Sequence, residues 1–320
     1  MTRALFAERQ TRLSDIATED TTFRITTTKD KDPEALARSI ARVGLLSPPV
    51  LATFSTGTWQ VVTGFRRLRA AEKLGLSSLP CRTLNKAAPL DCLEIAIADN
   101  AWQRSLNIVE QSRAVVKLGR FLHDPMVLCQ IAADVGLSVN LDLVEKLKMI
   151  YELPPEVIDE ISRGNLGLAM AVDLAGLEDP AAVSLARLFR ELKLGLNKQR
   201  AMAHRIREIS AREGITIGQL LDEKEISRIL SETDGDRAHR AARLKDCLDR
   251  RRYPAISKAG DDFYRRVKAL RPGPKARLAP PPNFEGKDYT LRLSFESNSD
   301  LEDHISLLRR LAESDLLNRR

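Results

Sequence analysis

The chain has 320 residues, a formal net charge of +7 and a pI of about 9.3, and 43% of its residues are hydrophobic while only 5% are aromatic. This composition is typical of a soluble, helix-rich protein of two or three small domains, and it excludes a β-sandwich with an aromatic core. The positive charge favours a polyanionic partner such as nucleic acid, a nucleotide or an anionic membrane surface, but charge alone does not choose among them.

Cysteine spacing and apolar runs narrow the class further. The four cysteines (Cys81, Cys92, Cys129 and Cys247) are far apart and form no CxxC pair or Cys/His cluster, which favours reduced, mostly buried thiols over a zinc site. Residues 1–15 lack the apolar core of a signal peptide, and no apolar run approaches the roughly 18 residues of a transmembrane helix. We therefore expect a cytoplasmic protein without a membrane partner.

The N-terminal third is predicted to be a flexible arm over residues 1–20 and a small mixed α/β domain over residues 21–110. Helix and strand signals alternate here, and glycines mark the ends of both predicted helices. In chain order we expect a helix at 33–43 opened by Asp32 and Pro33, a hairpin of strands at 50–54 and 59–63, a helix at 65–74 and a strand at 78–84.

Strand signals almost vanish from Ala87 onward, so the following region is predicted to be helical. One helix begins after Asn107, whose side chain can cap it while Glu110 closes a capping box. Further along, Gly136 lies between the first two of three predicted helices, a pattern either of a DNA-binding helix-turn-helix or of an ordinary helical hairpin. Residues 111–180 are the expected helix-turn-helix domain.

The C-terminal half is predicted to be a charge-rich helical extension over residues 181–270, a proline-rich linker over residues 271–288 and a strand–helix element over residues 289–320. We expect Ser299 to cap the last helix. Its apolar positions at helical spacing are Leu301, Ile305, Leu308 and Leu311. One strand and one helix bury little surface alone, so this element should dock on its own chain or on a second copy.

The segment from Trp59 to Gly75 predicts a strand, a glycine and a helix that opens with two arginines. A helix N-terminus presents unpaired backbone N–H groups and a positive dipole, which suit phosphate oxygens. Gly64 allows a close approach of the backbone, and Arg66 and Arg67 add permanently charged donors. The GxxxxGK[ST] pattern of a Walker loop is missing. The segment is therefore either a phosphate site or an arginine-rich, solvated helix face.

A second polar group spans Asp99 to Arg104 at a helix end and contains a carboxylate, two amides and a guanidinium. Carboxylate and carbonyl oxygens are hard ligands that suit Mg²⁺ bridging phosphates, and the arginine can share the phosphate charge. Alone, the same residues also suit a capped interhelical loop. Two such segments favour an anion pocket more than either does alone, and we predict that they fold together beside a DNA-reading helical module.

Taken in order, four motifs resemble the ParB-type chromosome and plasmid partition proteins. The motifs are GLLSPPV, VVTGFRRLRAAEKLG with LPCRTL, ADNAWQRSLNIVEQ, and a helical pair ending in ELPPEVIDEISRGNLGLAMAVDL. They follow the family's G-hydrophobic-x-x-P, GERRxRA and ENxQRxxLxxxE signatures and its helix-turn-helix closed by a Leu-Pro dipeptide. The resemblance covers residues 20–180, and four ordered motifs over this length are specific. It implies an α+β fold, with a small mixed α/β N-domain, a predominantly helical helix-turn-helix domain and a C-terminal strand–helix dimerisation element.

The resemblance also implies ligands and partners. The family's N-domain binds CTP with Mg²⁺, its middle domain binds a DNA site, its dimers close into a sliding clamp, and a ParA-type ATPase is a further partner of such nucleoid-associated proteins. By position, the nucleotide would contact Ser47, Gly64, Arg66, Arg67, Asn100, Gln103 and Arg104. The metal would contact Asp99 and Asn100, and DNA would contact Ser138, Asn140, Lys146 and Lys148.

Departures from the family pattern bear on the chemistry. The glutamate of GERR is Phe65 here, and the glutamate of ENxQR is Asp99. A phenyl ring neither ligates a metal nor orients a water, so we assign no catalytic residue and expect at most a weak CTPase. In the expected DNA-reading helix, Asp142 and Glu145 would repel the phosphates that supply most affinity. The favoured function is a nucleotide-responsive DNA clamp in chromosome or plasmid partition, with weak or lost hydrolysis.

Two other functions stay open on the sequence. One is a stand-alone helix-turn-helix transcription regulator that keeps the fold without a CTP switch. The other is a ParB-like CTPase or nuclease. Sulfiredoxin chemistry, which belongs to a related N-domain, is disfavoured because no cysteine lies in the GFRR segment. The four histidines lack catalytic partners at any familiar spacing, so we expect structural or surface roles for them.

Overall fold

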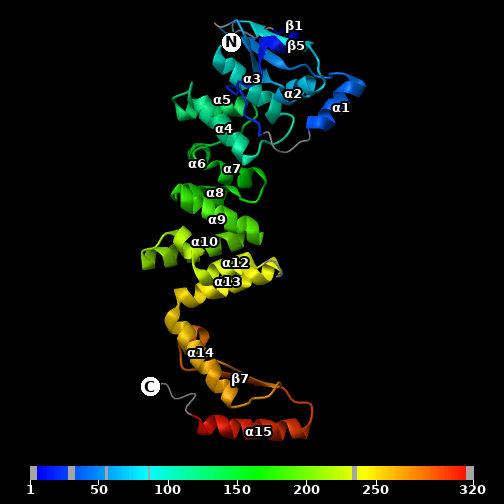
Figure 1. Ribbon diagram of the computed structural model, residues 1–320. Coiled ribbons are helices and arrows are strands. Elements are labelled where there is room, and N and C mark those ends of the chain that lie inside the picture. Colours follow the sequence, from blue (N-terminus) through cyan, green and yellow to red (C-terminus); the bar gives the residue numbers. More distant parts are fainter. Residues whose placement is uncertain (1–5, 28–32, 55–56, 86, 233–235, 315–320) are drawn as a thin grey trace. The chain divides into compact units, whose positions relative to one another are not determined.

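Two compact units make up the chain in the computed structural model, Met1–Gln199 (unit 1) and Arg200–Arg320 (unit 2), and Figure 1 labels their elements. The structure describes residues 6–27, 33–54, 57–85, 87–232 and 236–314. Unit 1 holds a five-stranded sheet followed by helices, and unit 2 holds helices and a two-stranded sheet. The α+β class expected from the sequence is confirmed. Within those residues no helix is both long and apolar enough to span a membrane.

The sheet of unit 1 has the strand order β1-β5-β3-β4-β2. Its strands are β1 (Phe6–Arg12), β2 (Ile16–Ala17), β3 (Val50–Thr53), β4 (Trp59–Thr63) and β5 (Ser78–Asn85). β3 and β4 form the antiparallel hairpin expected from two β-branched runs, whereas β3 and β5 are parallel. The chain passes from β4 to β5 through α2 (Phe65–Lys73), so this helix starts at the carboxyl end of β4.

The flexible arm expected over residues 1–20 is wrong for residues 6–17. β1 pairs along its whole length with β5, and β2 pairs with β4. β1 has no hydrophobic alternation because it is an edge strand whose side chains are mostly polar and exposed. The Arg82 guanidinium on β5 lies 3.9 Å from the ring centroid of Phe6, a cation–π contact that adds to the backbone pairing.

Helices α1 to α9 lie in unit 1 and include every helix expected there. Their bounds are α1 (Pro33–Val43), α2 as above, α3 (Pro89–Ala101), α4 (Ile108–Gly119), α5 (Pro125–Asp134), α6 (Leu141–Tyr151), α7 (Pro155–Ser162), α8 (Leu168–Ala175) and α9 (Asp179–Leu192). The predicted capping box is present, since Asn107 Oδ1 accepts the N–H of Glu110 at 2.9 Å and a Glu110 oxygen accepts the N–H of Asn107 at 3.1 Å. Gly136, at φ +88°, forms the turn after α5. Asp32, expected to open α1, lies outside the described residues.

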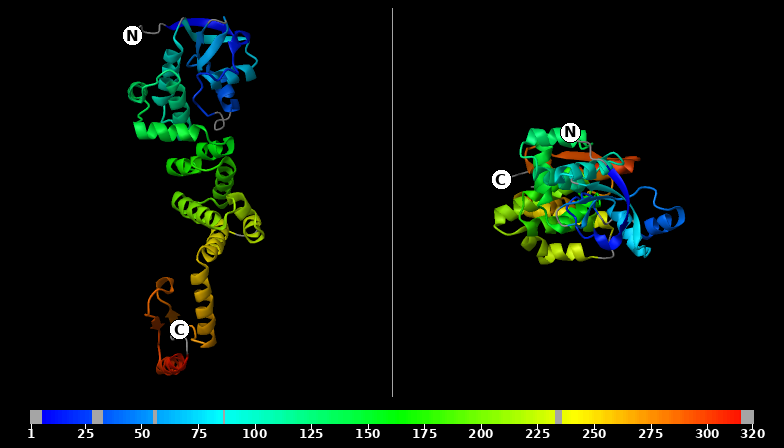
Figure 2. Two further views of the ribbon diagram at one scale, coloured as in Figure 1. Left: turned by 90° about the vertical axis from the view of Figure 1, so that its left-hand side faces the viewer. Right: turned by 90° about the horizontal axis from the view of Figure 1, so that it is seen from above.

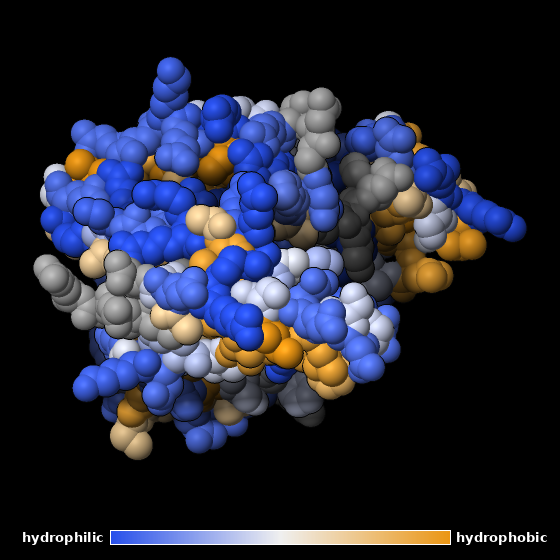
Figure 3. Space-filling model, turned by 90° about the horizontal axis from the view of Figure 1, so that it is seen from below, coloured by the Kyte–Doolittle hydropathy of each residue, from blue (hydrophilic) through white to orange (hydrophobic). Residues whose placement is uncertain are grey.

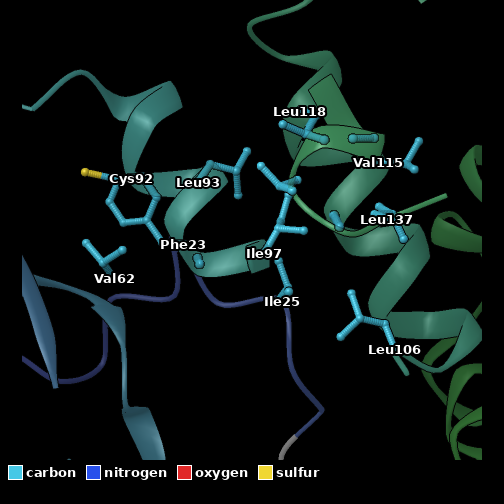
Figure 4. Packing of buried hydrophobic residues seen from close by; sticks show 14 of the residues in the cluster. Phe23, Ile25, Val62, Cys92, Leu93, Ile97, Leu106, Val115, Leu118 and Leu137 are labelled. Carbon is cyan, nitrogen blue, oxygen red and sulfur yellow. The ribbon is translucent and has the colours of Figure 1, made fainter. Parts of the chain in front are cut away.

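One hydrophobic core joins the sheet to the helices of unit 1. It runs from Val62 of β4 through α3 and α4 to Leu147 of α6, and Figures 1 and 2 show α3 beside the sheet. In Figure 4, Phe23 lies between Val62 of β4 and Leu93 of α3. The boundary expected at residues 110 and 111 is therefore no break in packing, because α4 contributes to the same core as the sheet.

Unit 2 contains helices, a hairpin and a terminal helix. Its elements are α10 (Leu196–Glu213), whose first residues lie in unit 1, α11 (Ile217–Asp222), α12 (Lys224–Ser231), α13 (Arg237–Arg252), α14 (Pro254–Ala269), β6 (Ala276–Ala279), β7 (Thr290–Leu293) and α15 (Asn298–Glu313). The proline-rich segment at 271–288 is not a plain linker, because β6 lies in it and pairs antiparallel with β7. A two-stranded sheet consists only of edges, and prolines beside edge strands break no ladder hydrogen bonds.

The start and the buried face of α15 both differ from expectation. Ser297 caps the helix, not Ser299, and its Oγ accepts a backbone N–H of the first turn at 3.2 Å. The buried residues of the helix are His304, Leu307 and Leu311. Three of the four predicted apolar positions are exposed instead: Leu301, Ile305 and Leu308. Figure 3 shows one face of the molecule, on which hydrophobic surface (orange) lies among hydrophilic surface (blue).

Candidate functional site

A cavity of about 630 Å³ opens in unit 1 where three segments of the chain meet. Its walls come from residues 23–27, from the first turn of α2 and from the end of α3 with the turn that precedes α4. The predicted nucleotide and metal residues all line it: Ser47, Gly64, Arg66, Arg67, Asp99, Asn100, Gln103 and Arg104. The two polar motifs, which are well separated in the sequence, thus share one hollow, as the sequence predicts.

The first turn of α2 faces the cavity with donors that have no partner. Gly64 precedes the helix at φ +94°, and a Cβ there would lie 2.8 Å from the Cβ of Pro49, so the position requires glycine. The N–H groups of Phe65 and Arg66 belong to a first turn and have no intrahelical acceptor. Thr63 is only 3% exposed, and its Oγ1 lacks a hydrogen-bond partner in the described part of the chain. Burying an unpaired hydroxyl is costly, so a bound acceptor would be stabilised here.

The first two of the three arginines of α2, Arg66 and Arg67, are in different environments. Arg66 is exposed and forms no hydrogen bond or ion pair with any residue that the structure describes. Arg67 donates to the carbonyl and hydroxyl oxygens of Ser47 at 2.5 and 2.8 Å and to the carbonyl of Pro48 at 3.1 Å. Burial lowers the pKa of the Arg67 guanidinium, and the Asp99 carboxylate, 3.8 Å away, offsets part of that effect. Arg67 therefore fixes the loop after α1, whereas Arg66 has no partner among the described residues.

Arg104 forms a bidentate ion pair with a buried carboxylate. Its Nη1 and Nη2 each lie 2.7 Å from an oxygen of Glu110, which is 1% exposed. Glu110 also accepts the N–H groups of Asn107 at 3.1 Å and Thr27 at 3.2 Å. Burial raises the pKa of Glu110, but the hydrogen bonds from Arg104, Asn107 and Thr27 outweigh it and bring the pKa below its ordinary value. This carboxylate ties the 23–27 wall to the start of α4.

The remaining predicted residues lie together at the end of α3. Asp99 accepts a hydrogen bond from Nε2 of Gln103 at 3.1 Å. Asn100 donates from Nδ2 to the carbonyl of Ala96 at 2.8 Å, which leaves its amide oxygen without a partner among the described residues. No group of three or more Cys, His, Asp or Glu side chains suited to a metal occurs within the described ranges. The site is therefore richer in donors than in carboxylate oxygens.

Sequence patterns did not reveal the wall at 23–27. Arg24 lines the cavity with its guanidinium 5.6 Å from the ring centroid of Phe65, and its Nε is buried without a partner in the described chain. Burial lowers the pKa of Arg24, and the positive charges of Arg69 and Arg113 lower it further. A short alternation of apolar and polar residues at 23–27 was the one sequence signal that could have found this wall.

The residues expected to contact DNA lie before α6 or along it: Ser138, Asn140, Lys146 and Lys148. Ser138 and Asn140 are exposed, and Asn140 Oδ1 caps α6 by accepting a backbone N–H at 2.8 Å. The two lysines form ion pairs within the helix, one with Asp142 at 2.5 Å and one with Glu145 at 2.8 Å. The positive charge of this helix is therefore locally compensated.

The arginine clusters of unit 2 are also engaged. Arg251 forms ion pairs with Glu213 and Glu223, and Arg252 forms one with Glu208. These contacts connect α13 with neighbouring helices of the same unit. Arg251 and Arg252 thus contribute to the packing of unit 2.

Comparison with known proteins shows what this chain is similar to. Residues 8–101 match the family model of the ParB N-terminal domain. Over 188 residues the chain is 30% identical to the chromosome-partitioning protein ParB of Caulobacter vibrioides (strain NA1000 / CB15N). This match covers 58% of this chain and 59% of that protein. The chain thus spans less than two thirds of the length of that relative.

Two solved structures of the C-terminally truncated chromosome-partitioning protein ParB from Caulobacter crescentus are also similar. The complex with CTP-γ-S is 26% identical, covers 57% of this chain and 98% of that chain, and has a TM-score of 0.28. The complex with the centromeric parS site is 25% identical, covers 61% of this chain and 98% of that chain, and has a TM-score of 0.36. The matched residues 8–101 include the first turn of α2 and, of the motif at the end of α3, Asp99 and Asn100 but not Gln103 or Arg104. Residues 8–101 are therefore similar to a ParB N-terminal domain, and the chain is similar to a chromosome-partitioning protein over 188 residues.

Proposed function

We propose that this chain is a ParB-type, nucleotide-responsive DNA-binding protein whose unit 1 cavity holds CTP. The observation that carries the proposal is that all the residues assigned to the nucleotide by sequence resemblance line one cavity. Its volume of about 630 Å³ is within the range of small-molecule sites. The similarity to chromosome-partitioning proteins supports the same proposal.

The phosphate groups would bind at the first turn of α2. Arg66 offers a free guanidinium, the N–H groups of Phe65 and Arg66 point along the helix dipole, and the Thr63 hydroxyl is an unpaired donor. Arg67 and Arg104 would act as positioning residues, because their donors already hold the loop after α1 and the start of α4. The ligand would thus meet a rigid cradle with its own set of donors.

Mg²⁺, which the resemblance placed at Asp99 and Asn100, finds few oxygens in this cavity. Asp99 is engaged by an amide and lies near an arginine, and the other carboxylate, Glu110, is taken by Arg104. A magnesium site commonly combines one or two available carboxylates with phosphates and waters. The residues present fit phosphate groups but do not fit a metal site, and no step is assigned to a metal.

Hydrolysis of the nucleotide is expected to be weak or absent. Phe65 occupies the position at which the family motif has a glutamate, and its ring offers no oxygen to orient an attacking water. Neither Glu110 nor Asp99 can replace that glutamate without giving up its present partner. Binding without turnover would make the ligand a conformational effector and not a substrate.

Titration calorimetry with CTP tests the site. The wild-type chain should give a saturable isotherm, and Arg66→Ala should bind about tenfold more weakly or worse, since a charged hydrogen bond contributes about 1.5–3 kcal/mol. Arg69→Ala is the matched control, because Arg69 is also exposed on α2 but does not line the cavity. Flat wild-type traces would remove the nucleotide site and leave the regulator without a CTP switch. Equal weakening by both variants would reduce the effect to general charge.

We propose further that α5 and α6 act as a helix-turn-helix on DNA in chromosome or plasmid partition, with a ParA-type ATPase as a partner. Ser138 and Asn140 precede α6, where they can reach base edges or phosphates. Because both lysines of α6 are paired with carboxylates, binding should depend only weakly on salt. Mobility shifts between 50 and 200 mM salt measure this, and no shift of any DNA at the lowest salt would exclude the module.

A second copy of the chain is the proposed partner of α15. Its exposed face carries Leu301, Ile305 and Leu308, which a dimer would bury. Light scattering of the wild-type chain should give the mass of a dimer, and Ile305→Glu should give a monomer. Asp303→Lys, a charge change on an already polar residue of the same helix, is the control and should stay dimeric. A monomeric wild-type chain at micromolar concentration would contradict the proposal.

A further inference from the structure

Arg24 lies in the wall of the cavity, and its guanidinium forms no ion pair with a carboxylate of that wall. Its side chain is half-buried and stacks on Phe65, with the guanidinium 5.6 Å from the ring centroid. It makes no side-chain hydrogen bond or ion pair with the residues that the structure describes, and its Nε is buried and unpaired. The positive charges of Arg69 and Arg113 destabilise its charged form further, and the carboxylate of Glu19, which does not line the cavity, offsets part of this effect. A partly desolvated cation in this position lacks an anion.

Neighbouring groups in the same cavity lack an acceptor as well. The buried Thr63 hydroxyl has no partner in the described chain, and Arg66 is free. Four arginines and two carboxylates line the cavity, which leaves a net charge of +2 on its walls. The missing ligand is therefore an anion with several oxygens.

The position of Phe65 explains why Arg24 is unpaired. A glutamate at this position, as in the family motif, would stand beside the guanidinium and neutralise it. The phenyl ring instead supports the guanidinium by its face and takes none of its donors, so the two terminal NH₂ groups have no hydrogen-bond partner among the described residues. One substitution thus removes a carboxylate that could hold a metal and exposes a fixed cation in its place.

We propose that Arg24 supplies the positive charge that a metal would otherwise bring, so that this cavity binds the phosphate groups of a nucleoside triphosphate without a divalent cation. The inference rests on the proposed nucleotide site and specifies how that site neutralises its ligand. A fixed guanidinium and a metal ion can fill the same role toward phosphate, but only the guanidinium is insensitive to chelators.

Equilibrium binding of CTP in two buffers, one with Mg²⁺ and one with EDTA, tests the proposal on the full chain. The wild-type dissociation constants should agree within about threefold. Arg24→Met keeps an unbranched side chain on Phe65 but removes the charge, and it should weaken binding in EDTA about tenfold, the loss of one charged hydrogen bond. Arg69→Met is the matched control, because it removes a nearby positive charge outside the cavity. Circular dichroism confirms that each variant is folded.

A third variant reverses the substitution. Phe65→Glu should pair with Arg24, lose binding in EDTA and regain it with Mg²⁺. Wild-type binding that requires Mg²⁺ would overturn the inference and leave the nucleotide site intact, and so would an Arg24→Met variant that binds like the wild type in EDTA. Absence of binding in both buffers would instead refute the nucleotide site itself, and this inference with it.

Discussion

Replacing Glu110 by glutamine isolates the charge of the carboxylate that closes the cavity. The side chain is buried and receives four hydrogen bonds, two from Arg104 and one each from the N–H groups of Asn107 and Thr27. Glutamine has the same shape, but one of its two acceptors becomes an NH₂ group that faces donors. The variant therefore keeps the packing and loses both the ion pair and part of the hydrogen bonding.

The expected cost follows from the exposure of the two partners. Breaking a fully buried ion pair costs about 3–5 kcal/mol. The Arg104 side chain is 44% exposed, so water hydrates its charge in the variant and the penalty is smaller. We expect the free energy of unfolding to fall by about 1.5–3 kcal/mol, the range for hydrogen bonds to charged groups. Glu145→Gln, which removes an exposed pair with Lys148, should cost less than about 0.5 kcal/mol.

Urea denaturation followed by tryptophan fluorescence measures this difference. Both tryptophans of the chain, Trp59 and Trp102, lie in unit 1, so the signal reports the unfolding of that unit. The folded-state pKa of Glu110 is below its ordinary value of 4.5, so the folded state binds fewer protons than the unfolded state near that pH. The stabilising effect is complete above pH 4.5 and disappears as the pH falls through the folded pKa. A cost equal to that of the control, or one that grows in acid, would refute the reasoning.

Three further perturbations test other parts of unit 1. Gly64→Ala should cost about 2 kcal/mol or more in thermal unfolding, and Gly75→Ala only about 1 kcal/mol, because both have positive φ but only the first meets a neighbour at 2.8 Å. Burial lowers the pKa of Lys117 to about 8, so the stability of the wild type relative to Lys117→Met should rise between pH 8 and pH 10.5, by at most about 1.4 kcal/mol per pH unit, a difference that cancels the titration of the buried thiols. Asp142→Asn with Glu145→Gln frees both lysines of α6 and should steepen the salt dependence of DNA binding by about 1.8 in log–log slope, whereas an unchanged slope in mobility shifts would place the lysines off the DNA.

Local signals in the sequence were sufficient for most helices and for the central hairpin. The capping box at Asn107 and Glu110 is a short-range pattern, and the structure reproduces it in full. The hairpin of β3 and β4 also follows from adjacent β-branched runs. In these places the stabilising partners lie within a few residues of one another, so a linear pattern contains the information.

Strands whose partners lie far away in the sequence were missed. β1 is polar and exposed, and it is held in place by pairing with β5, which lies far along the sequence. Phe6 of β1 pairs with Leu84 of β5. β6 lies in a proline-rich segment and is held by β7. β1 has no apolar period and the alternation of β6 covers only four residues, so backbone pairing and edge position override the local propensity.

The residues of the site were predictable from ordered motifs, but their roles were not. The sequence cannot tell that the donors of Arg67 are satisfied by Ser47, or that Arg104 is satisfied by Glu110, because each bond depends on how two segments approach in space. Arg24 was not predicted as a site residue because it belongs to no motif. It lines the cavity only because the 23–27 segment packs against α3 and α4.

Helix α4 connects the cavity wall to the helical pair that follows it. One face binds the backbone of the N-terminal segment: Glu110 accepts from Thr27, Arg113 donates to the carbonyl of Thr26 at 3.0 Å, and Lys117 donates to the carbonyls of residues 21 and 22. From the same helix, Ser112 donates to the carbonyl of Leu147 on α6 at 2.6 Å. Because a helix moves as a rigid body and its core is closely packed, a ligand that displaces the 23–27 wall must either break these hydrogen bonds or shift α4 against α6. The arrangement thus gives a physical route from an anion in the cavity to the helices proposed to contact DNA, and the Glu110→Gln variant weakens that route at its first contact.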